Sequence, residues 1–390
     1  MLPLRYSLRS LWVRRSRAAL TVGVIALVVL AMGLLCGLVS SMKTSLAGAG
    51  SPRNLIVLRK GATSDGASAL PLEVYQALRF FDGVARDEGG EPLVSPELVV
   101  QPFGMTRWGS RESAQVRGVE APAFELRDEV RIRQGRRLRP SSAEAIVGRA
   151  AAARYAGAEP GGELALGNSR WRVVGIFESG GSALDSEIWV DARQLANDVK
   201  RPSPYSSLRL RVADGADVSA LIRRIESDPR FALAASVESD YYAKQAASTD
   251  ALYLVVAGLA LLAGTGAAFG ATNTLYAAVQ ARTREIGTLR ALGFSRGAIA
   301  LSFRLEAALM GLTGFGLGSG LAWLGALAIS ATVGDVSTFA MDGTALVSVR
   351  VGALDLAAAF ALAIAISLGG ALAPALRAAR LRPIDALRKG

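Results

Sequence analysis

The chain has 390 residues, 51% of them hydrophobic, and a formal net charge of +11. Its single cysteine, Cys36, excludes an intramolecular disulfide and a cysteine-based structural zinc site within one chain. The sequence contains no histidine, which excludes Ser-His and Cys-His dyads and removes the commonest general base. An enzyme here would depend on carboxylates, Lys or Tyr, and we predict no catalytic site and no metal site.

Four hydrophobic stretches dominate the chain, one near the N-terminus and three after about two hundred polar residues. They are residues 18–42, 252–280, 305–333 and 356–376. Each is about 20 residues or longer, the length that a helix needs to cross a hydrocarbon core of ~30 Å. Backbone polar groups must be satisfied internally in lipid, so we predict four membrane helices. The first stretch is longer than the apolar part of a signal peptide, and we interpret it as a retained anchor.

The positive charge is concentrated beside these stretches. Residues 43–250 carry 28 Lys and Arg against 27 Asp and Glu, so most of the excess lies in and beside the spans. Positive residues favour short cytoplasmic flanks, which places both termini and the segment after the second span in the cytoplasm. Residues 43–250 and the short loop 334–355 are then outside. A nucleic-acid partner is not expected, because the excess does not lie on one soluble face.

The polar region 43–250 alternates between strand and helix patterns. Alternating or apolar runs predict strands at 54–59, 97–101, 115–119, 145–147, 163–166, 172–177, 187–190, 207–212 and 231–237. Apolar residues at helical spacing predict helices at 71–81 and 217–226. We infer an α+β domain built from both ends of this region, with a β-rich insert at about 134–203. Residues 240–250 are expected to continue as helix into the second span.

Small residues predict where the membrane helices approach one another. The pairs Gly33 and Gly37, Gly266 and Gly270, and Gly314 and Gly318 each have the small-xxx-small spacing. The alternative is that glycine is simply common in membrane helices. No span carries a central cluster of ionisable residues, which argues against an ion-coupled carrier. Glu306 lies near the cytoplasmic end of its span, and we interpret it as a structural ion partner.

The segment 281–295, ARTREIGTLRALGFS, is predicted to form a cytoplasmic helix. Ile286, Leu289 and Leu292 offer apolar contacts, and Gly293 can end the helix. A short amphipathic helix of this kind can insert into a groove on a partner. A charged loop that only anchors the topology remains the alternative. The polar residues beside the apolar ones are Arg282, Arg284, Glu285 and Arg290.

This segment resembles the coupling helix of the MacB/FtsX-like permeases of ABC transporters. The tail 377–388, RAARLRPIDALR, is similar to the C-terminal signature of that family. The one-plus-three order of the spans and the large domain after the first span also match. Phrases in the outer region, such as residues 117–120 (RGVE) and 172–177, are similar to the extracytoplasmic core of the family.

The resemblance implies a permease subunit of the bacterial inner membrane without its own motor. No G-x-x-x-x-G-K-[ST] phosphate loop occurs, so ATP and Mg²⁺ would be bound by a separate pair of ABC ATPase subunits. A second permease copy or a homologue would complete the complex, with membrane lipid around it and a periplasmic adaptor or substrate-binding protein as further partners. The expected ATPase contact comprises Arg282, Arg284, Glu285, Ile286, Leu289 and Arg290, shaped by Gly287 and Gly293, with residues 380–388 bracing the same partner.

The implied activity is mechanotransmission, in which ATP hydrolysis moves the outer domain to export or extract a lipid, lipoprotein, peptide or hydrophobic small molecule. An FtsX-like regulator that activates a cell-wall hydrolase is the first alternative. A membrane-anchored enzyme is the second. The predicted organisation is a lead-in at 1–17, helices at 18–42, 251–280, 299–333 and 356–376, the outer domain at 43–250, the coupling helix at 281–298, the loop at 334–355 and a tail at 377–390.

Overall fold

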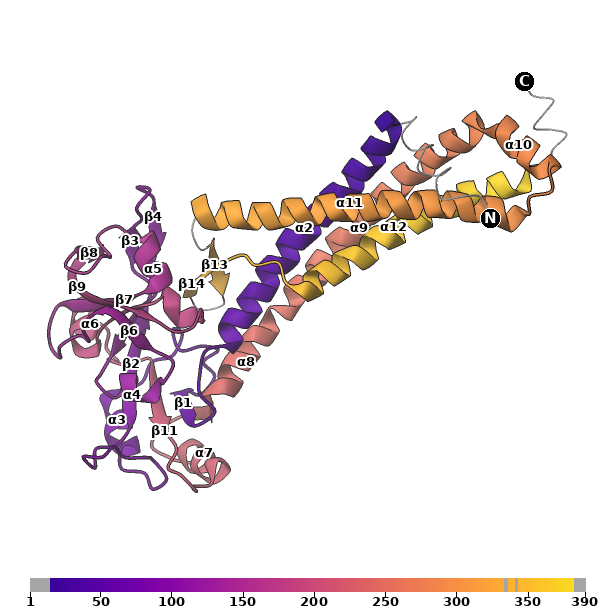
Figure 1. Cartoon of the computed structure of the whole chain (residues 1–390). Coiled ribbons are helices and arrows are strands. Elements are labelled where there is room, and N and C mark those ends of the chain that lie inside the picture. The colour runs from indigo at the N-terminus through magenta and orange to yellow at the C-terminus, as the bar shows by residue number, and fades with distance from the viewer. Residues whose placement is uncertain (1–14, 333–335, 341–342, 382–390) are drawn as a thin grey trace. The chain divides into compact units, whose positions relative to one another are not determined.

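The computed structural model describes residues 15–332, 336–340 and 343–381, which fall into two compact units (Figure 1). The helical unit comprises Met1–Ser40, Ala251–Ala328 and Val349–Gly390. The sheet unit comprises Ser41–Asp250 and Ile329–Ser348. Most of the predicted lead-in and all of the tail from residue 382 lie outside the described residues.

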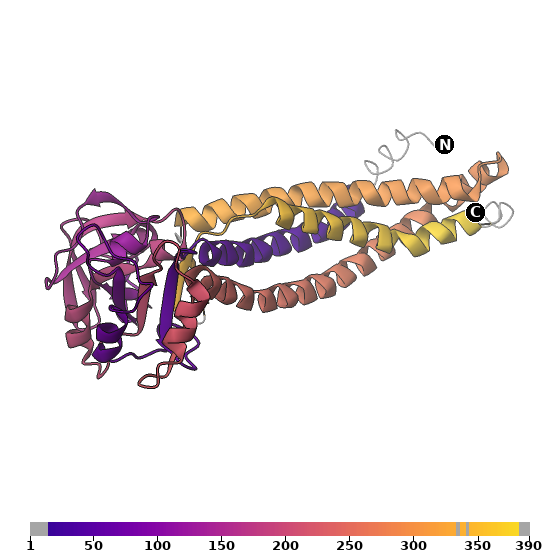
Figure 2. The ribbon, with the colours of Figure 1, turned by 90° about the horizontal axis from the view of Figure 1, so that it is seen from below.

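The described part of the helical unit contains four long helices and one short helix (Figure 2). The described residues contain four helices that are long and apolar enough to cross a membrane, which confirms the predicted fold class: Ala18–Ala47, Glu238–Ala281, Arg296–Ser330 and Ala353–Arg380. As secondary structure, the elements are α2 (Arg15–Ala47), α9 (Asp250–Ala281), α10 (Thr283–Ala291), α11 (Arg296–Thr332) and α12 (Ala353–Arg380). At ~1.5 Å per residue α2 is ~50 Å long, so it extends beyond the hydrocarbon core.

Glycines bring α11 and α2 into backbone contact. A Cβ placed on Gly318 would lie 2.5 Å from the carbonyl oxygen of Ala26, and one on Gly314 would lie 2.7 Å from Ile25. From the opposite helix, a Cβ on Gly33 would lie 3.1 Å from Ala322. Small residues replace the hydrophobic driving force that is missing between helices in lipid, so this seam sets the separation of the two helices.

Among the other glycines predicted to lie at helix contacts, Gly37 packs against a neighbouring backbone, whereas Gly266 and Gly270 do not. A Cβ on Gly37 would lie 2.9 Å from the carbonyl oxygen of Arg350. A Cβ on Gly266 or Gly270 would meet nothing within 4 Å in the described part of the chain, so these two glycines do not form the expected contact between helices. The packed face of α9 instead contains Gly264, which contacts α12. Positions 264 and 266 lie on opposite sides of α9, because successive helical residues turn by about 100°.

The larger sheet among the described residues of the sheet unit has twelve strands. Its order is β12-β1-β11-β2-β5-β10-β7-β9-β8-β3-β4, and β6 also pairs with β9. The strands are β1 (Asn54–Arg59), β2 (Val94–Val100), β3 (Phe103–Met105), β4 (Arg111–Ser113), β5 (Val116–Val119), β6 (Arg131–Gly135), β7 (Glu144–Gly148), β8 (Glu163–Leu166), β9 (Ser169–Glu178), β10 (Ile188–Asp191), β11 (Ser207–Arg211) and β12 (Leu233–Val237).

Two hydrophobic cores divide this sheet into an α+β part and a β-rich part. The first core includes Leu55 and Leu210, and the second includes Leu98 and Trp171. Strand β2 belongs to both, because residues 94–97 pair with β11 and residues 98–100 pair with β5. Strands β3, β4 and β5, which precede residue 134, belong to the same sheet as the strands of the predicted insert at about 134–203.

Short helices cover the sheet and connect its strands. They are α3 (Leu72–Leu78), α4 (Ala123–Leu126), α5 (Arg149–Arg154), η1 (Ala183–Ser186), α6 (Ala192–Val199), α7 (Val218–Glu226) and α8 (Glu238–Ser248). Asp217 caps α7 by accepting from the N–H groups of Ser219 and Ala220. Only Thr249 separates α8 from α9, as expected for a helix that leads into the second span. In the segment expected to be a simple loop, β13 (Val336–Ala340) and β14 (Gly343–Val347) form an antiparallel hairpin.

We predict that Gly318→Val destabilises the helical unit by about 1–3 kcal/mol, because the added side chain collides with the backbone of α2. Gly316→Val is the matched control, since a Cβ there meets nothing within 4 Å. Thermal unfolding of the purified full chain in detergent measures both. Equal melting temperatures for the two variants would show that the α2–α11 seam does not depend on Gly318.

Candidate coupling site and buried charge network

The predicted coupling helix is α10, and its two ends are sharply defined. Arg282 separates it from α9, and Leu292 is its C-cap. Gly293 has φ +90°, the N–H of Gly293 donates to the carbonyl of Arg290, and the N–H of Phe294 donates to that of Leu289. These bonds form a Schellman motif, which requires a left-handed residue at position 293. Gly293 therefore ends the helix as the sequence predicted.

One side of α10 is packed inside the helical unit. Ile286 is 3% exposed and belongs to a core with Val279 of α9, Phe303 of α11 and Ala378 of α12. Gly287 is also buried. Because residues from three long helices meet under α10, its position is fixed by the ends of those helices. Ile286 and Gly287 shape the base of the site, and their predicted part in an ATPase contact stays a prediction.

Arg282 also belongs to this base. Its side chain is 9% exposed and its Nη1 lies 3.1 Å from the carboxylate of Glu306, which is 7% exposed. Glu306 was expected to be a structural ion partner, and Arg282 is the group that it pairs with. A buried pair of this kind is costly to break, because the remaining charge is left uncompensated. Arg282 is thus placed to fix the start of α10, and its predicted part in an ATPase contact stays a prediction.

The opposite side of α10 is exposed. Arg284, Glu285 and Thr288 lie on this face, and Leu292 at its end is 72% exposed. Leu289 and Arg290 are half-buried, and Arg290 donates from Nη1 to the carbonyl of Phe294 at 3.0 Å. Arg290 thereby braces the turn after the helix. The surface available to a partner is therefore a mixed one, with an exposed leucine beside charged groups.

The C-terminal end of α12 lies at the same end of the helical unit as α10 (Figure 1). Ala378 and Ala379 pack in the core below α10, whereas Arg377 and Arg380 are exposed. The guanidinium of Arg377 lies 5.6 Å from the ring centre of Tyr276. These arginines add positive charge beside the exposed face of α10. The rest of the predicted bracing patch, residues 382–388, lies outside the described residues.

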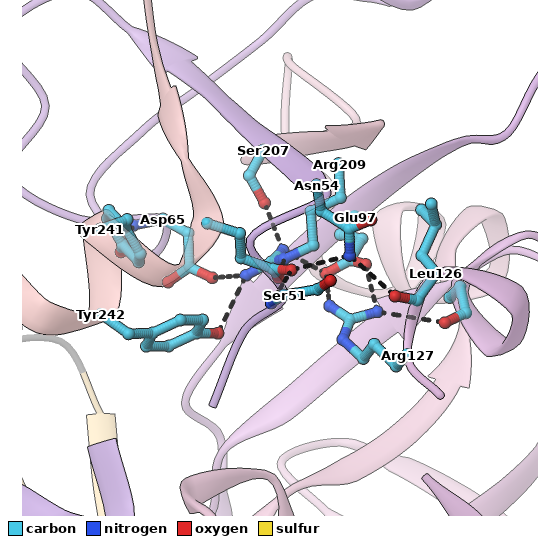
Figure 3. A network of polar contacts seen from close by, with 12 residues as sticks. Ser51, Asn54, Asp65, Glu97, Leu126, Arg127, Ser207, Arg209, Tyr241 and Tyr242 are labelled. Atoms are coloured by element: carbon cyan, nitrogen blue, oxygen red, sulfur yellow. Dashed lines mark hydrogen bonds and ion pairs between the residues drawn. The ribbon is translucent and has the colours of Figure 1, made fainter. Parts of the chain in front are cut away.

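A second polar site, which we call the buried charge network, lies inside the sheet unit (Figure 3). It consists of three arginines and four carboxylates: Arg117, Arg127, Arg209, Asp65, Glu97, Glu187 and Glu238. None of these side chains is more than 8% exposed. Charges so far from water are tolerated only when they are paired and hydrogen-bonded.

Glu97 of β2 is the centre of the network. It pairs with Arg117 of β5 at 2.9 Å, with Arg127 at 2.8 Å and with Arg209 of β11. Burial alone would raise the pKa of Glu97, but these three guanidinium groups hold it well below its usual range. Glu97 is therefore ionised at neutral pH, and it joins strands from both cores of the sheet unit.

The network also reaches α8, the helix that precedes the predicted second span. Glu238, its first residue, accepts from Arg209 Nε at 2.8 Å and from Asn54 Nδ2 at 2.9 Å. Arg209 also donates from Nη2 to the hydroxyl of Tyr242 at 3.2 Å. The pKa of Glu238 is lowered, because the arginines outweigh the effect of its burial. The start of α8 is thus fixed to the sheet by ionised groups.

On its other side, the network contacts the β-rich part through Arg117. This guanidinium pairs with Glu187 at 2.6 Å and with Asp65 at 2.9 Å. Glu187 further accepts from the indole N–H of Trp189 at 2.7 Å. Neutral donors such as this indole help to satisfy carboxylates that outnumber the arginines. No local sequence pattern predicts the network, although Arg117 lies in the segment 117–120 that is similar to the extracytoplasmic core of the family.

Two protein families match different parts of the chain. Residues 18–228 match the MacB-like periplasmic core domain, and residues 257–383 match the FtsX-like permease C-terminal domain. The chain belongs to the MacB/FtsX-like family of ABC transporter permeases. The second match covers α10 and most of the helical unit, so the resemblance predicted from the segment 281–295 is confirmed. The four long apolar helices of the chain agree with the inner-membrane location of this family.

Similar proteins include bacterial macrolide exporters and an uncharacterised permease. The chain is 29% identical over 207 residues to the macrolide export ATP-binding/permease protein MacB 1/2 of Paracoccus denitrificans, covering 48% of this chain and 29% of the relative. It is 25% identical over 246 residues to MacB of Neisseria meningitidis, covering 60% and 36%. It is 33% identical over 136 residues to the uncharacterised ABC transporter permease YknZ of Bacillus subtilis, covering 34% and 30%. The matches thus span only about a third of each relative.

Two solved structures are also similar to the chain. The periplasmic region of MacB from Actinobacillus actinomycetemcomitans gives a TM-score of 0.39 at 14% identity, covering 50% of this chain and 91% of that one. The extracellular domain of the transporter YknZ from Gram-positive bacteria gives 0.37 at 14% identity, covering 47% and 99%.

We predict that Glu97→Gln destabilises the sheet unit by about 3–5 kcal/mol, because three buried arginines lose their common partner. Glu91→Gln is the matched control. Glu91 is 74% exposed in its pair with Arg79, and such pairs contribute about 1 kcal/mol or less. Chemical unfolding of the full chain, followed by the fluorescence of the buried Trp171 and Trp189, compares the two. An equal loss in both variants would contradict a central role for Glu97.

We also predict that acid destabilises the sheet unit. The pKa values of Asp65, Glu97 and Glu238 are lowered in the folded protein, despite burial, by Arg117, Arg127 and Arg209. Their contribution to stability is therefore complete above the pKa of the unfolded chain and is lost as the pH falls below about 4.5. The half-buried Glu129 acts in the opposite direction, because burial raises its pKa.

Unfolding measured between neutral pH and pH ~3 is the corresponding test. The wild type should lose stability steeply at the acid end, and Glu97→Gln should show a shallower dependence. Parallel pH profiles for the two proteins would show that folding does not lower the pKa of Glu97.

Proposed function

We propose that this chain is a permease subunit that transmits the energy of ATP hydrolysis from a separate pair of ABC ATPase subunits to its sheet domain. In this proposal α10 docks into a cytoplasmic groove of the ATPase. The observation that carries the proposal is that α10 has two different sides. Its packed base contains Ile286 and the Arg282–Glu306 pair, and its exposed face contains Arg284 and Leu292. A firmly seated helix with a mixed exposed face suits a groove on a partner.

The family membership supports this assignment. The matched relatives in Paracoccus and Neisseria are named as ATP-binding/permease proteins, whereas the one in Bacillus is named as a permease. Binding of ATP and Mg²⁺ would belong to the ATPase pair and not to this chain, which would be non-catalytic. A second permease copy or homologue would complete the complex. Both chain termini and α10 would lie in the cytoplasm, with the sheet domain outside.

The substrate class that we propose is a lipid, lipoprotein, peptide or hydrophobic small molecule, taken up outside the membrane. The described membrane helices carry no central cluster of ionisable groups, in agreement with force delivered to the sheet domain instead of transport through a polar channel. The match of residues 257–383 to the FtsX-like C-terminal domain also favours a second candidate, a regulator that activates a cell-wall hydrolase. ATP hydrolysis stimulated by lipid or peptide would favour transport, and binding of a soluble hydrolase would favour regulation.

We predict that Arg284→Glu combined with Leu292→Asp lowers co-purification with a co-expressed ABC ATPase by at least about tenfold, because exposed arginine and apolar anchors dominate such interfaces. ATP hydrolysis by the purified complex should fall with the amount of bound ATPase. Size-exclusion chromatography of the permease alone shows whether it remains folded.

The matched control changes the same kinds of residue in the sheet unit. Arg223→Glu combined with Val199→Asp alters an exposed arginine and an exposed apolar residue there. This control should retain the ATPase. Equal recovery of the ATPase by both double variants would remove α10 as the docking element.

A further inference from the structure

Strand β6 and the residues that follow it form an unusually basic surface of the sheet unit. Residues 131–139, RIRQGRRLR, contain five arginines and no carboxylate. All five arginines are exposed, and we call them the β6 arginine patch: Arg131, Arg133, Arg136, Arg137 and Arg139. These five arginines are nearly a fifth of the basic residues of the region 43–250, and they lie within nine consecutive positions.

This patch is opposite in charge to the rest of its region. Residues 43–250 carry 28 basic and 27 acidic residues, so without these five arginines the region would be net negative. The charge asymmetry is therefore a property of this one segment. A concentrated field of one sign attracts ligands of the opposite sign and raises their rate of association.

Neighbouring carboxylates neutralise only part of the patch. Arg133 pairs with Glu178, and Arg136 pairs with Glu144 at 2.5 Å. Arg131, Arg137 and Arg139 form no ion pair with a carboxylate of the described residues, although Arg131 helps to lower the pKa of Glu178 and Arg139 that of Glu144. The guanidinium of Arg137 lies over the ring of Phe124, 4.8 Å from its centre, which holds it in position. Three arginines therefore remain available to an anion.

Protection of a sheet edge does not account for this composition. Within the described part of the chain β6 pairs with β9 alone, so it is an edge strand, and charged residues at edges discourage pairing with other chains. The register shift between Ile132 and Gln134 already forms a bulge that serves this purpose. Edge protection also works with charge of either sign, whereas every charge here is positive.

The surroundings of the patch favour a small charged group over a protein surface. The apolar residues of the segment, Ile132 and Leu138, are half-buried and pack on the core that contains Phe124 and Trp189. The patch thus lacks the exposed aromatic or aliphatic anchor on which stable protein interfaces depend. Exposed guanidinium and ammonium groups both attract an anionic lipid surface through their positive charge.

We propose that the β6 arginine patch binds the phosphate groups of anionic lipid headgroups. The choice of a lipid rests on the substrate class of the proposed function. The patch lies in the sheet unit, and α10 lies in the helical unit. Variants of the patch should therefore leave co-purification of the ATPase unchanged, and variants of α10 should leave vesicle binding unchanged.

A local probe beside the patch tests this proposal. The full chain with Cys36→Ala and Gln134→Cys carries one fluorophore at position 134 and is held in phosphatidylcholine nanodiscs. Vesicles that contain phosphatidylglycerol and a lipid with a nitroxide on its headgroup quench only a fluorophore that they approach closely. We expect saturable quenching with these vesicles and none with vesicles of phosphatidylcholine and the same nitroxide lipid. A fluorophore at Ser219→Cys, on the exposed part of α7, should not be quenched.

Substitutions then assign the binding to the patch. Arg131→Gln, Arg137→Gln and Arg139→Gln together should weaken binding on the order of a hundredfold, because each basic residue contributes about tenfold or less near an anionic surface. The corresponding triple lysine variant keeps the charge and should retain most of the affinity. The triple variant Arg59→Gln, Arg111→Gln and Arg223→Gln, which removes the same charge elsewhere in the sheet unit, should bind like the wild type.

Five results would overturn the proposal. Wild-type chain that binds both kinds of vesicle equally has no preference for anionic headgroups. Wild-type chain that binds neither kind leaves an acidic protein as the occupant. Equal losses in the patch and control glutamine variants indicate a general charge effect. Loss in the lysine variant as severe as in the glutamine variant indicates a disturbed edge strand. Release of bound vesicles by inorganic phosphate indicates a site for the free ion.

Discussion

The sheet domain depends on the burial of seven ionised groups at the place where its two cores meet. Glu97 pairs with arginines that come from β5, from β11 and from the segment after α4. Such a network adds little net stability over an apolar core, because desolvation cancels most of the attraction. Its effect is on geometry, since a shift of any one strand would leave a buried charge without its partner. The network therefore fixes the register between the α+β part, the β-rich part and the start of α8.

Much of this architecture could be predicted because local pattern and tertiary environment agree. Strand β1 has the bounds that its apolar run predicted, and α7 starts after the capping residue Asp217. The four spans could be predicted because lipid allows few alternatives for the backbone. Gly293 could be assigned to the end of α10 because a left-handed residue is required there. In each case a short stretch of sequence contains the whole physical reason for the structure.

The features that were missed depend on residues far apart in the sequence. Strands β3 and β4 have three residues each, which is too short for a periodic signal, and the arginines of β6 do not suggest a strand. Arg117 and Glu187 are 70 positions apart, so nothing local marks them as buried partners. Composition alone does not show whether Gly264 or Gly266 contacts another helix. Only the packing of α12 identifies Gly264 as the contact residue. No local pattern predicts that Arg282 is buried, because its partner Glu306 lies on another helix.

The proposed transmission of force requires that movement of α10 be carried along the chain and not absorbed by loops. From Glu238 to Ala281 the chain is helical except at Thr249, and α10 follows after Arg282 alone. Each end of this path is held by a buried ion pair, Arg209 with Glu238 in the sheet unit and Arg282 with Glu306 in the helical unit. A helix attached at both ends transmits displacement better than a flexible linker, because few torsions along it are free to change. Weakening the Arg209–Glu238 pair, which is not part of the proposed docking site, should therefore uncouple ATP hydrolysis from movement of the sheet unit while leaving the ATPase bound.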